Sequence, residues 1–332
     1  MPWILLGGLS FALGYAVFQS GGVLTGDWNW CLLAIGVVTC LHMATSWREP
    51  APPLDWISRG LLAAMVLLSL LQVVPLPVAV VRWLSPLRME IAAAAFPVDG
   101  SVSWLTLSAV PDATWAELRS VLAFGLVCVV VRDLCARFDD RPWIVAAPLI
   151  VIAFLEAVLG LVQASLSGNE VARGTYVNRD QFAGFLEMVL PFAVLAAVAI
   201  LRRHHRRFES PAGPALRACG LLVMAACVFI AILLSLSRMG FLAALASLFV
   251  MGTLSVGVAR VGWKRWAPGL AVLVLVAAAI VYLPTDALIA RFASLAATDQ
   301  ISSDTRAQIW QDSMGLVRAF PVAGCGVGAY ES

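Results

Sequence analysis

The stretch that organises the chain is ARGTYVNRDQFAGFL, which runs from Ala172 to Leu186. Within it, Arg173, Arg179 and other polar residues stand between two long apolar segments, roughly 143–166 and 182–201. A charged side chain close to a bilayer core costs free energy, so it is seldom found there without a function. A compact cationic connection at a membrane face is suited to bind the diphosphate of a polyprenyl-linked lipid, and this is the first hypothesis that the sequence suggests.

The composition indicates an integral membrane protein. Of the 332 residues, 61% are hydrophobic and 13% are charged, whereas soluble domains carry about 25% charged residues. The formal net charge of +2 gives no sign of a nucleic-acid partner. Every basic residue except Lys264 is an arginine. Phosphate recognition and a GC-rich genome both explain this bias, and the two explanations stay open.

The cysteine and histidine patterns predict neither a metal site nor a cofactor. None of the seven cysteines forms a CxxC pair, and the chain contains no HExxH motif. Zinc and redox sites of the common kinds need such spacings. We therefore expect a protein that works without a metal and without a cofactor.

Nine apolar segments are candidates for membrane helices, which need about 20 mostly apolar residues. The fold class that they predict is all-α, a polytopic transmembrane helical bundle. The first segment lacks the basic start and the cleavage site of a signal peptide, so we expect it to be retained. The segments are approximately Trp3–Phe18, Trp28–Thr45, Ile57–Val81, Ala116–Val131, Trp143–Leu166, Phe182–Leu201, Leu216–Leu236, Phe241–Val258 and Ala267–Leu283.

The distribution of basic residues predicts the orientation of the chain in the membrane. If the N-terminus is cytoplasmic, most of the basic residues fall in inside loops. The run RRHHRR from Arg202 to Arg207 strongly favours the cytoplasmic side. We therefore expect a multi-pass protein of a bacterial inner membrane, with Ala172–Leu186 at the periplasmic face and membrane lipids around the helices.

The chain is expected to have two parts. Residues 1–166 would form the N-terminal membrane helices with an interfacial loop at 82–115, in which MEIAAAAF suggests a short amphipathic helix. The residues from Thr114 to Glu117 have the pattern of a capping box and would begin the fourth membrane helix. Residues 167–332 would form a second membrane region that includes part of a periplasmic loop, 284–332.

The fifth predicted helix carries a polar face. Glu156, Gly160 and Gln163 are four and three residues apart, so they lie on one side of a helix. A glutamate beside a small residue and an amide favours a polar seam between helices, although a functional role for this face is a second interpretation. Glu187 and Pro191 of the next helix are the candidate partners.

The seventh and eighth predicted helices are joined by a very short connection that contains Arg238. One interpretation is a snorkelling arginine at a helix end. The other is a second anion contact that converges with Arg173 from a different pair of helices. The sequence alone leaves both open.

The tail from Pro284 onward is expected on the periplasmic side of the membrane. A short amphipathic helix is predicted at about Asp304–Arg318, with Ser303 as its N-cap and with Arg306 and Trp310 on one face. Glycine then recurs at every second position, but no strand precedes these residues and no Lys-Ser/Thr follows, so a nucleotide-binding loop is not indicated. A flexible turn or a close approach of the backbone is the better interpretation. The glycines are Gly324, Gly326 and Gly328.

Four motifs of the C-terminal half occur together and in order. They are GTYVNRDQFAGFLEMVLP, SLSRMGF, the R-x-x-x-W of Arg306–Trp310, and the P-x-x-G-x-G-x-G of Pro321–Gly328. In order and spacing the region from about Arg173 to Ser332 resembles the O-antigen ligase/O-antigen polymerase (Wzy-like) membrane proteins. Many relatives read Asn-Arg-Asn where this chain has Asn178, Arg179 and Asp180.

The resemblance implies a GT-C-like, inverting, metal-independent enzyme that transfers or polymerises glycans at the periplasmic face. The donor would be an undecaprenyl-diphosphate-linked glycan, and the acceptor another glycan or lipid A core. Arg173, Arg238 and Arg306 match family arginines thought to hold the donor diphosphate. Supporting roles would fall to Asn178, Arg179, Asp180, Trp310, Gly324, Gly326 and Gly328.

The resemblance also implies a catalytic histidine after the glycine-rich turn, beyond Ser332. The histidines that the chain does contain, His42, His204 and His205, do not replace it. On this basis we expect the chain to be a C-terminally shortened member that is inactive by itself.

Two other classes of function remain as alternatives. A transporter or flippase-like carrier of anionic lipid-linked substrates would show internal repeats and broken helices at the middle of the bilayer, and no convincing repeat is found. A non-catalytic membrane scaffold is the third hypothesis.

Overall fold

The computed structural model describes residues 1–46, 53–95, 103–138, 141, 143–166, 171–207, 212–257 and 308–331. Over these ranges the chain is almost entirely helical, with one small two-stranded sheet. The chain divides into two compact units, each of which is described by itself. Unit 1 comprises Met1–Thr45 and Val131–Phe292, and unit 2 comprises Ser46–Val130 and Ala293–Ser332.

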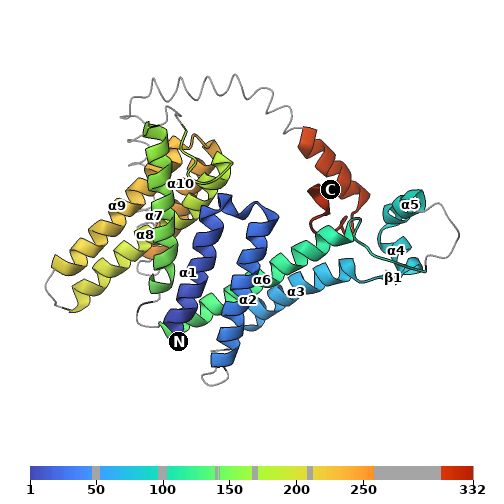
Figure 1. Cartoon of the computed structure of the whole chain (residues 1–332), viewed down its shortest axis with the longest axis horizontal. Coiled ribbons are helices and arrows are strands. Elements are labelled where there is room, and N and C mark those ends of the chain that lie inside the picture. The colour runs from blue at the N-terminus through green and yellow to red at the C-terminus, as the bar shows by residue number, and fades with distance from the viewer. Residues whose placement is uncertain are drawn as a thin grey trace. The chain divides into compact units, whose positions relative to one another are not determined.

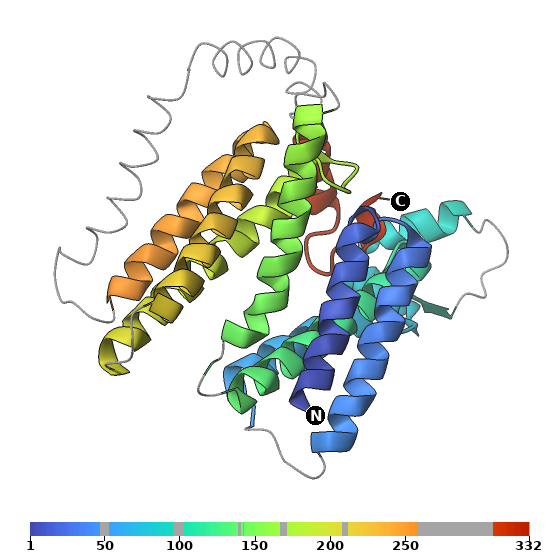
Figure 2. The ribbon, with the colours of Figure 1, turned by 60° about the vertical axis from the view of Figure 1, so that its left-hand side comes forward.

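Unit 1 is a bundle of long helices (Figures 1 and 2). Helices α7 to α10 pack against one another, and α1 packs against α7. The bundle is built from α1 (Pro2–Phe18), the short 3-10 helix η1 (Ser20–Gly22), α2 (Thr25–Ser46), α7 (Trp143–Leu166), α8 (Arg179–Arg207), α9 (Ala212–Leu234) and α10 (Arg238–Gly257).

One face of α8 forms the centre of this bundle. Phe182, Leu186, Leu190, Ala193 and Ala197 are buried and follow one another at steps of three or four residues, the spacing of a single helix face. Alanines recur among the buried positions of the bundle. Small side chains let membrane helices approach one another closely, and this close packing takes the place of a hydrophobic driving force in lipid. The fully or almost fully buried alanines of the described part of unit 1 are Ala153, Ala157, Ala172, Ala183, Ala193, Ala197, Ala218, Ala231 and Ala244.

Unit 2 combines two long helices with a small lateral motif. Strand β1 pairs antiparallel with β2, so that Leu76 lies opposite Leu105. Figure 1 shows α4 and α5 beside β1. The elements are α3 (Trp56–Val73), β1 (Leu76–Pro77), α4 (Val78–Leu84), α5 (Pro86–Ala95), β2 (Trp104–Leu105), α6 (Pro111–Arg137, whose end belongs to unit 1), a helical segment at 308–319, and the 3-10 helix η3 (Ala329–Glu331).

The structure confirms a helical membrane protein but does not support all nine predicted membrane helices. Within the described residues, five helices are long and apolar enough to cross a membrane, and two shorter apolar helices accompany them. The five are Thr25–Thr45, Trp56–Val73, Trp143–Leu166, Arg179–Leu201 and Gly213–Leu234, and the two shorter ones are Pro2–Phe18 and Arg238–Thr253. The predicted ninth helix, Ala267–Leu283, lies outside the described residues.

The prediction of one continuous third helix, Ile57–Val81, is wrong. Helix α3 ends at Val73, and Val74 is extended with ψ of 128°. Pro75 explains this end, because a proline disfavours helical geometry at the residue before it and cannot donate to the helical ladder. The chain enters β1 and then begins the separate helix α4 at Val78.

The predicted start of the fourth helix is also wrong. Helix α6 begins at Pro111 rather than at the Thr114 capping box, because proline suits the first helical position, where no backbone donor is needed. The Thr114 hydroxyl is buried and lies 2.7 Å from the Ser108 hydroxyl. With 27 residues, α6 extends beyond the predicted segment at both ends.

Candidate functional site

A fully buried glutamate holds the loop that contains Arg173. The side chain of Glu156, on α7, accepts a hydrogen bond from the backbone N–H of Thr175 and lies 2.9 Å from the Thr175 hydroxyl. That hydroxyl also lies 2.7 Å from the carbonyl oxygen of Val17 at the end of α1. The loop therefore has fixed contacts with two helices.

A second contact from the same face of α7 binds the preceding residue of the loop. The Gln163 side-chain amide donates to the carbonyl oxygen of Gly174 at 2.9 Å. Gly174 has φ of +59°, and a Cβ there would collide with the carboxyl group of Glu156. The predicted polar face is thus present, but its partners are loop residues rather than Glu187 and Pro191.

Tyr176 closes the loop against the bundle. Its ring lies 6.1 Å from the ring of Phe185 and 6.3 Å from that of Phe182, between ring centroids. A Cβ on Gly21 would come within 2.6 Å of the Tyr176 ring. Burial raises the pKa of the Tyr176 hydroxyl above its ordinary value, and the charge of Glu156 adds to this effect.

Asn178 and Asp180 begin helix α8. The Asn178 side-chain oxygen accepts a hydrogen bond from the backbone N–H of Asp180 at 2.8 Å, and the Asn178 carbonyl accepts from Phe182 at 3.1 Å. This is N-cap geometry, and Asp180 in the first turn complements the positive end of the helix dipole. Asn178 and Asp180 are exposed, and Arg179 is partly exposed. Substrate contacts of this triplet stay a prediction.

Arg238 is the first residue of α10, after a tight turn. Its side chain is exposed. The Ser237 hydroxyl oxygen accepts from the Gly240 backbone at 3.2 Å, so Ser237 caps the helix. Leu236 has a positive φ of 55° although it is a bulky residue, and the Ser235 hydroxyl accepts from the Ser237 backbone at 3.3 Å.

One backbone hydrogen bond joins the Arg173 loop to the Arg238 turn. The N–H of Ala172 donates to the carbonyl oxygen of Leu234 at 2.9 Å. Leu234 ends α9, where carbonyl groups have no partner within their own helix and need one from elsewhere. The two segments that carry the predicted arginines are therefore neighbours in unit 1.

The remaining predicted residues belong to unit 2. Gly324, Gly326 and Gly328 have φ of +70°, +118° and +81°, which confirms a turn that needs glycine. Trp310 lies on the helical segment 308–319 and is 74% exposed. Arg306, Ser303 and the predicted helix start at Asp304 lie outside the described residues.

The other polar cluster of unit 1 contains a histidine. His42 Nε2 and Arg137 Nε lie 2.9 Å and 2.8 Å from the same oxygen of Asp133, which is 1% exposed. Among the described residues no group of three or more His, Cys, Asp or Glu side chains could hold a metal ion. The cluster thus joins α2 to α6 by the contact between His42 and Asp133, beside an ion pair between Arg137 and Asp133 within α6.

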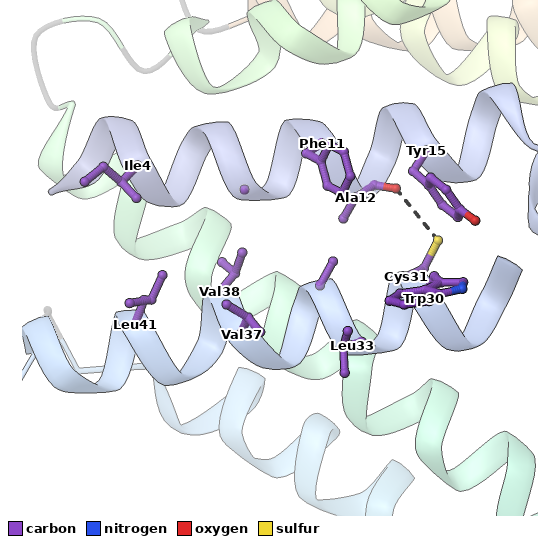
Figure 3. A pocket seen from close by; sticks show the side chains of 12 residues that line it. Ile4, Phe11, Ala12, Tyr15, Trp30, Cys31, Leu33, Val37, Val38 and Leu41 are labelled. Carbon is purple, nitrogen blue, oxygen red and sulfur yellow. Dashed lines mark hydrogen bonds between the residues drawn. The ribbon is translucent and has the colours of Figure 1, made fainter.

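A cavity of about 510 Å³ lies between α1 and α2 (Figure 3). Its lining is almost wholly apolar, with Phe11 and Trp30 among the large side chains. At one end the Cys31 thiol lies 3.8 Å from the carbonyl oxygen of Ala12, and the Tyr15 hydroxyl donates to Asp27 at 3.2 Å. A lining without a charged group does not suit a diphosphate.

The comparisons with known proteins agree with one part of the resemblance. Residues 222–332 match the family model described as O-antigen ligase. No curated protein and no solved structure matches the chain. The match includes Arg238, Arg306, Trp310 and the glycine-rich turn, but it begins after Arg173. Residues 222–332 of this helical membrane protein are therefore similar to the O-antigen ligase family.

Proposed function

We propose that the protein transfers or polymerises glycans from an undecaprenyl-diphosphate-linked donor in the biosynthesis of cell-surface polysaccharide. The family match of residues 222–332 supports the class of reaction. The observation that carries the site is the hydrogen bond from Ala172 to Leu234, because it makes neighbours of two exposed arginine-bearing segments. Arg173 and Arg238, both in unit 1, are the proposed ligands of the diphosphate. The family resemblance also assigns a donor-binding role to Arg306, which lies outside the described residues.

In the proposed reaction an acceptor hydroxyl attacks the anomeric carbon of the first sugar. The new C–O bond forms while the bond to the diphosphate breaks, and undecaprenyl diphosphate leaves with the bonding electrons. Negative charge grows on the leaving group, so arginines that grip it stabilise the transition state more than the bound donor. A base takes the hydroxyl proton, and attack opposite the leaving group inverts the anomeric centre. The family resemblance assigns this base to a histidine after the glycine-rich turn.

Contacts inside unit 1 support the proposed alternation of the helices across the membrane, and the basic residues of the loops support a periplasmic site. In unit 1 the connection after α1, the Arg173 loop and the connection after α9 are all predicted on the periplasmic side. They contact one another, since Thr175 contacts Val17 and Ala172 contacts Leu234. Elements predicted at the cytoplasmic ends also meet, as in the pair His42 and Asp133. Helices that cross a membrane in alternate directions bring every second connection to the same side. The predicted GT-C-like architecture remains part of the proposal.

The test is glycan transfer by the full-length protein in membranes that contain the natural acceptor, measured as release of undecaprenyl diphosphate. We expect Arg173→Ala and Arg238→Ala each to lower the rate by about 100-fold or more, as loss of a donor to a developing oxyanion does. Arg238→Lys should recover only part, since lysine lacks the planar fork of arginine. Arg217→Ala is the matched control, because Arg217 is an exposed arginine in the first part of α9.

Near-normal release by both alanine variants would refute the assigned roles. If neither release nor transfer occurs in the wild-type protein but lipid-linked glycan moves across the bilayer, the carrier alternative replaces the enzyme.

A further inference from the structure

Within unit 2, the side chain of Gln72 docks the glycine-rich turn, residues 323–327, onto the end of α3. This residue is the second to last of α3 and is 4% exposed. Its amide nitrogen donates to the carbonyl oxygen of Ala323 at 2.8 Å, and its amide oxygen accepts from the backbone N–H of Val327 at 2.9 Å. One side chain therefore binds both ends of the turn, with a donor at one end and an acceptor at the other. About 250 residues separate Gln72 from the turn in sequence.

Backbone contacts from the link before α6 complete the docking. The Ala109 N–H donates to the carbonyl oxygen of Cys325 at 2.8 Å, and the Ser108 N–H donates to the Gln72 carbonyl at 2.9 Å. Gly326 lies so close that a Cβ would come within 2.9 Å of the Ser108 Cβ and 3.0 Å of the Thr114 hydroxyl. The turn fits this surface only with glycine at 326.

Ser108, which contacts the turn, is itself held by other buried polar side chains. The Arg88 side chain is 7% exposed, and its Nε donates to the Ser108 carbonyl at 3.1 Å. Ser108 and Thr114 are fully buried, and their hydroxyls lie 2.7 Å apart. Buried hydrogen-bonded polar groups of this kind fix a single arrangement, because leaving any of them unpaired is costly.

The helical segment 308–319 leads directly into the docked turn. Its side chains are largely exposed, with Trp310 at 74% and Val317 at 63%. The chain runs from it through the buried Phe320, which is 7% exposed, into the turn, and the Ser313 hydroxyl lies 2.6 Å from the hydroxyl of Tyr330, which follows the turn. A change that undocks the turn would release this segment as well.

We infer that Gln72 is a positioning residue, whose side-chain amide docks the turn 323–327 and thereby holds the segment that carries Trp310 and follows Arg306. The inference rests on the proposed function for its catalytic consequence. Gln72 does not touch the substrate but orients groups that do. A small loss of orientation lowers the rate of the chemical step in the enzyme–substrate complex, and it leaves the affinity for the substrate almost unchanged.

The structural test uses the full-length protein with Cys325 as its sole cysteine. Cys325 lies in the turn and is partly buried, so its rate of alkylation by a maleimide reports docking. We expect Gln72→Leu to raise this rate by about 10- to 30-fold, since each lost hydrogen bond is worth roughly a factor of 5. Gln311→Leu, the same change at an exposed glutamine of the segment 308–319, should leave the rate unchanged.

A second substitution tests the same docking contact by a change in the turn itself. Gly326→Ala should raise the alkylation rate because of the contact with Ser108 and because a positive φ disfavours alanine. In the double variant the two effects should be far from additive, as expected for changes that break one contact. Equal alkylation rates in wild type, Gln72→Leu and Gly326→Ala would overturn the inference, and so would full additivity.

The catalytic test is the split between kcat and KM for an undecaprenyl-diphosphate-linked donor. Gln72→Leu should lower kcat with little change in KM, and Gln72→Glu, which keeps only the acceptor, should not restore it. A change in KM alone would contradict a positioning role. If the wild-type protein transfers no glycan while Gln72→Leu still exposes Cys325, the proposed function fails and the docking stands.

Discussion

The carboxyl group of Glu156 and the backbone of Thr175 are joined by a hydrogen bond in the interior of unit 1, with Glu156 fully buried. The bond ties a helix that is apolar enough to span the membrane to the loop that carries Arg173. A buried carboxyl side chain is costly unless it is hydrogen-bonded, and here Thr175 of the loop supplies the partners.

Two substitutions of Glu156 should show how much its hydrogen bond to Thr175 contributes to the stability of the loop. Glu156→Leu leaves the Thr175 N–H buried without an acceptor, which costs about 1–3 kcal/mol. Glu156→Gln keeps an acceptor oxygen and should remain close to wild type. Thermal unfolding in detergent, with limited proteolysis of the 171–178 loop, measures both. Equal stability of the leucine and glutamine variants would show that the bond does not hold the loop.

Gly174→Ala should destabilise the same loop by a change in the loop itself. The positive φ disfavours any side chain by about 1 kcal/mol, and the contact with Glu156 adds to this cost. The control is Gly184→Ala on α8, where a Cβ would meet nothing within 4 Å and alanine favours the helix. The difference between the two unfolding temperatures is the measurement. A Gly174 variant as stable as the Gly184 variant would argue against the observed loop.

Asn178→Ala should weaken the start of α8. Loss of an N-cap costs about 1 kcal/mol, whereas Asn178→Asp keeps the cap. Asn29→Ala, an exposed asparagine on α2, controls for the change of residue type. If Asn178→Asp unfolds as early as Asn178→Ala, the residue does not act as a cap. Glycan transfer by the aspartate variant then tests separately whether Asn178 contacts the substrate.

Tyr176 makes stability depend on pH in the alkaline range. Its folded-state pKa is raised above the ordinary value near 10, so its contribution is fully present below that value and is lost as pH rises through the folded-state pKa. The free energy of unfolding should fall above about pH 10, and Tyr176→Phe should remove part of the fall. Absorbance titration of the four tyrosines should also lose a late component in this variant. An unchanged titration curve would mean that the hydroxyl is not shielded as the structure indicates.

The residues of the candidate site could be named from the chain alone, and their roles in binding stay predictions. The arginines, the Ser-Leu-Ser-Arg turn and the alternating glycines stand out because charge and turn residues are rare in an apolar sequence. Gln72 and Ser108 could not be found in this way. A glutamine near the end of an apolar helix carries no local pattern that names its partner, and here that partner lies in the turn 323–327.

Composition and periodicity by themselves determined that the protein is helical and belongs in a membrane, because a bilayer requires each apolar segment to satisfy its own backbone hydrogen bonds. They misplaced the end of α3, where the predicted segment ran through Pro75, and the start of α6, where Pro111 precedes the predicted capping box at Thr114. Tertiary structure alone decided which connections meet: Ala172 with Leu234, Thr175 with Glu156, and Gln72 with the glycine-rich turn. The physical reason is that a local pattern depends on neighbours in sequence, whereas an unpaired donor or acceptor at a helix end is satisfied by whatever segment the packing brings within hydrogen-bonding distance.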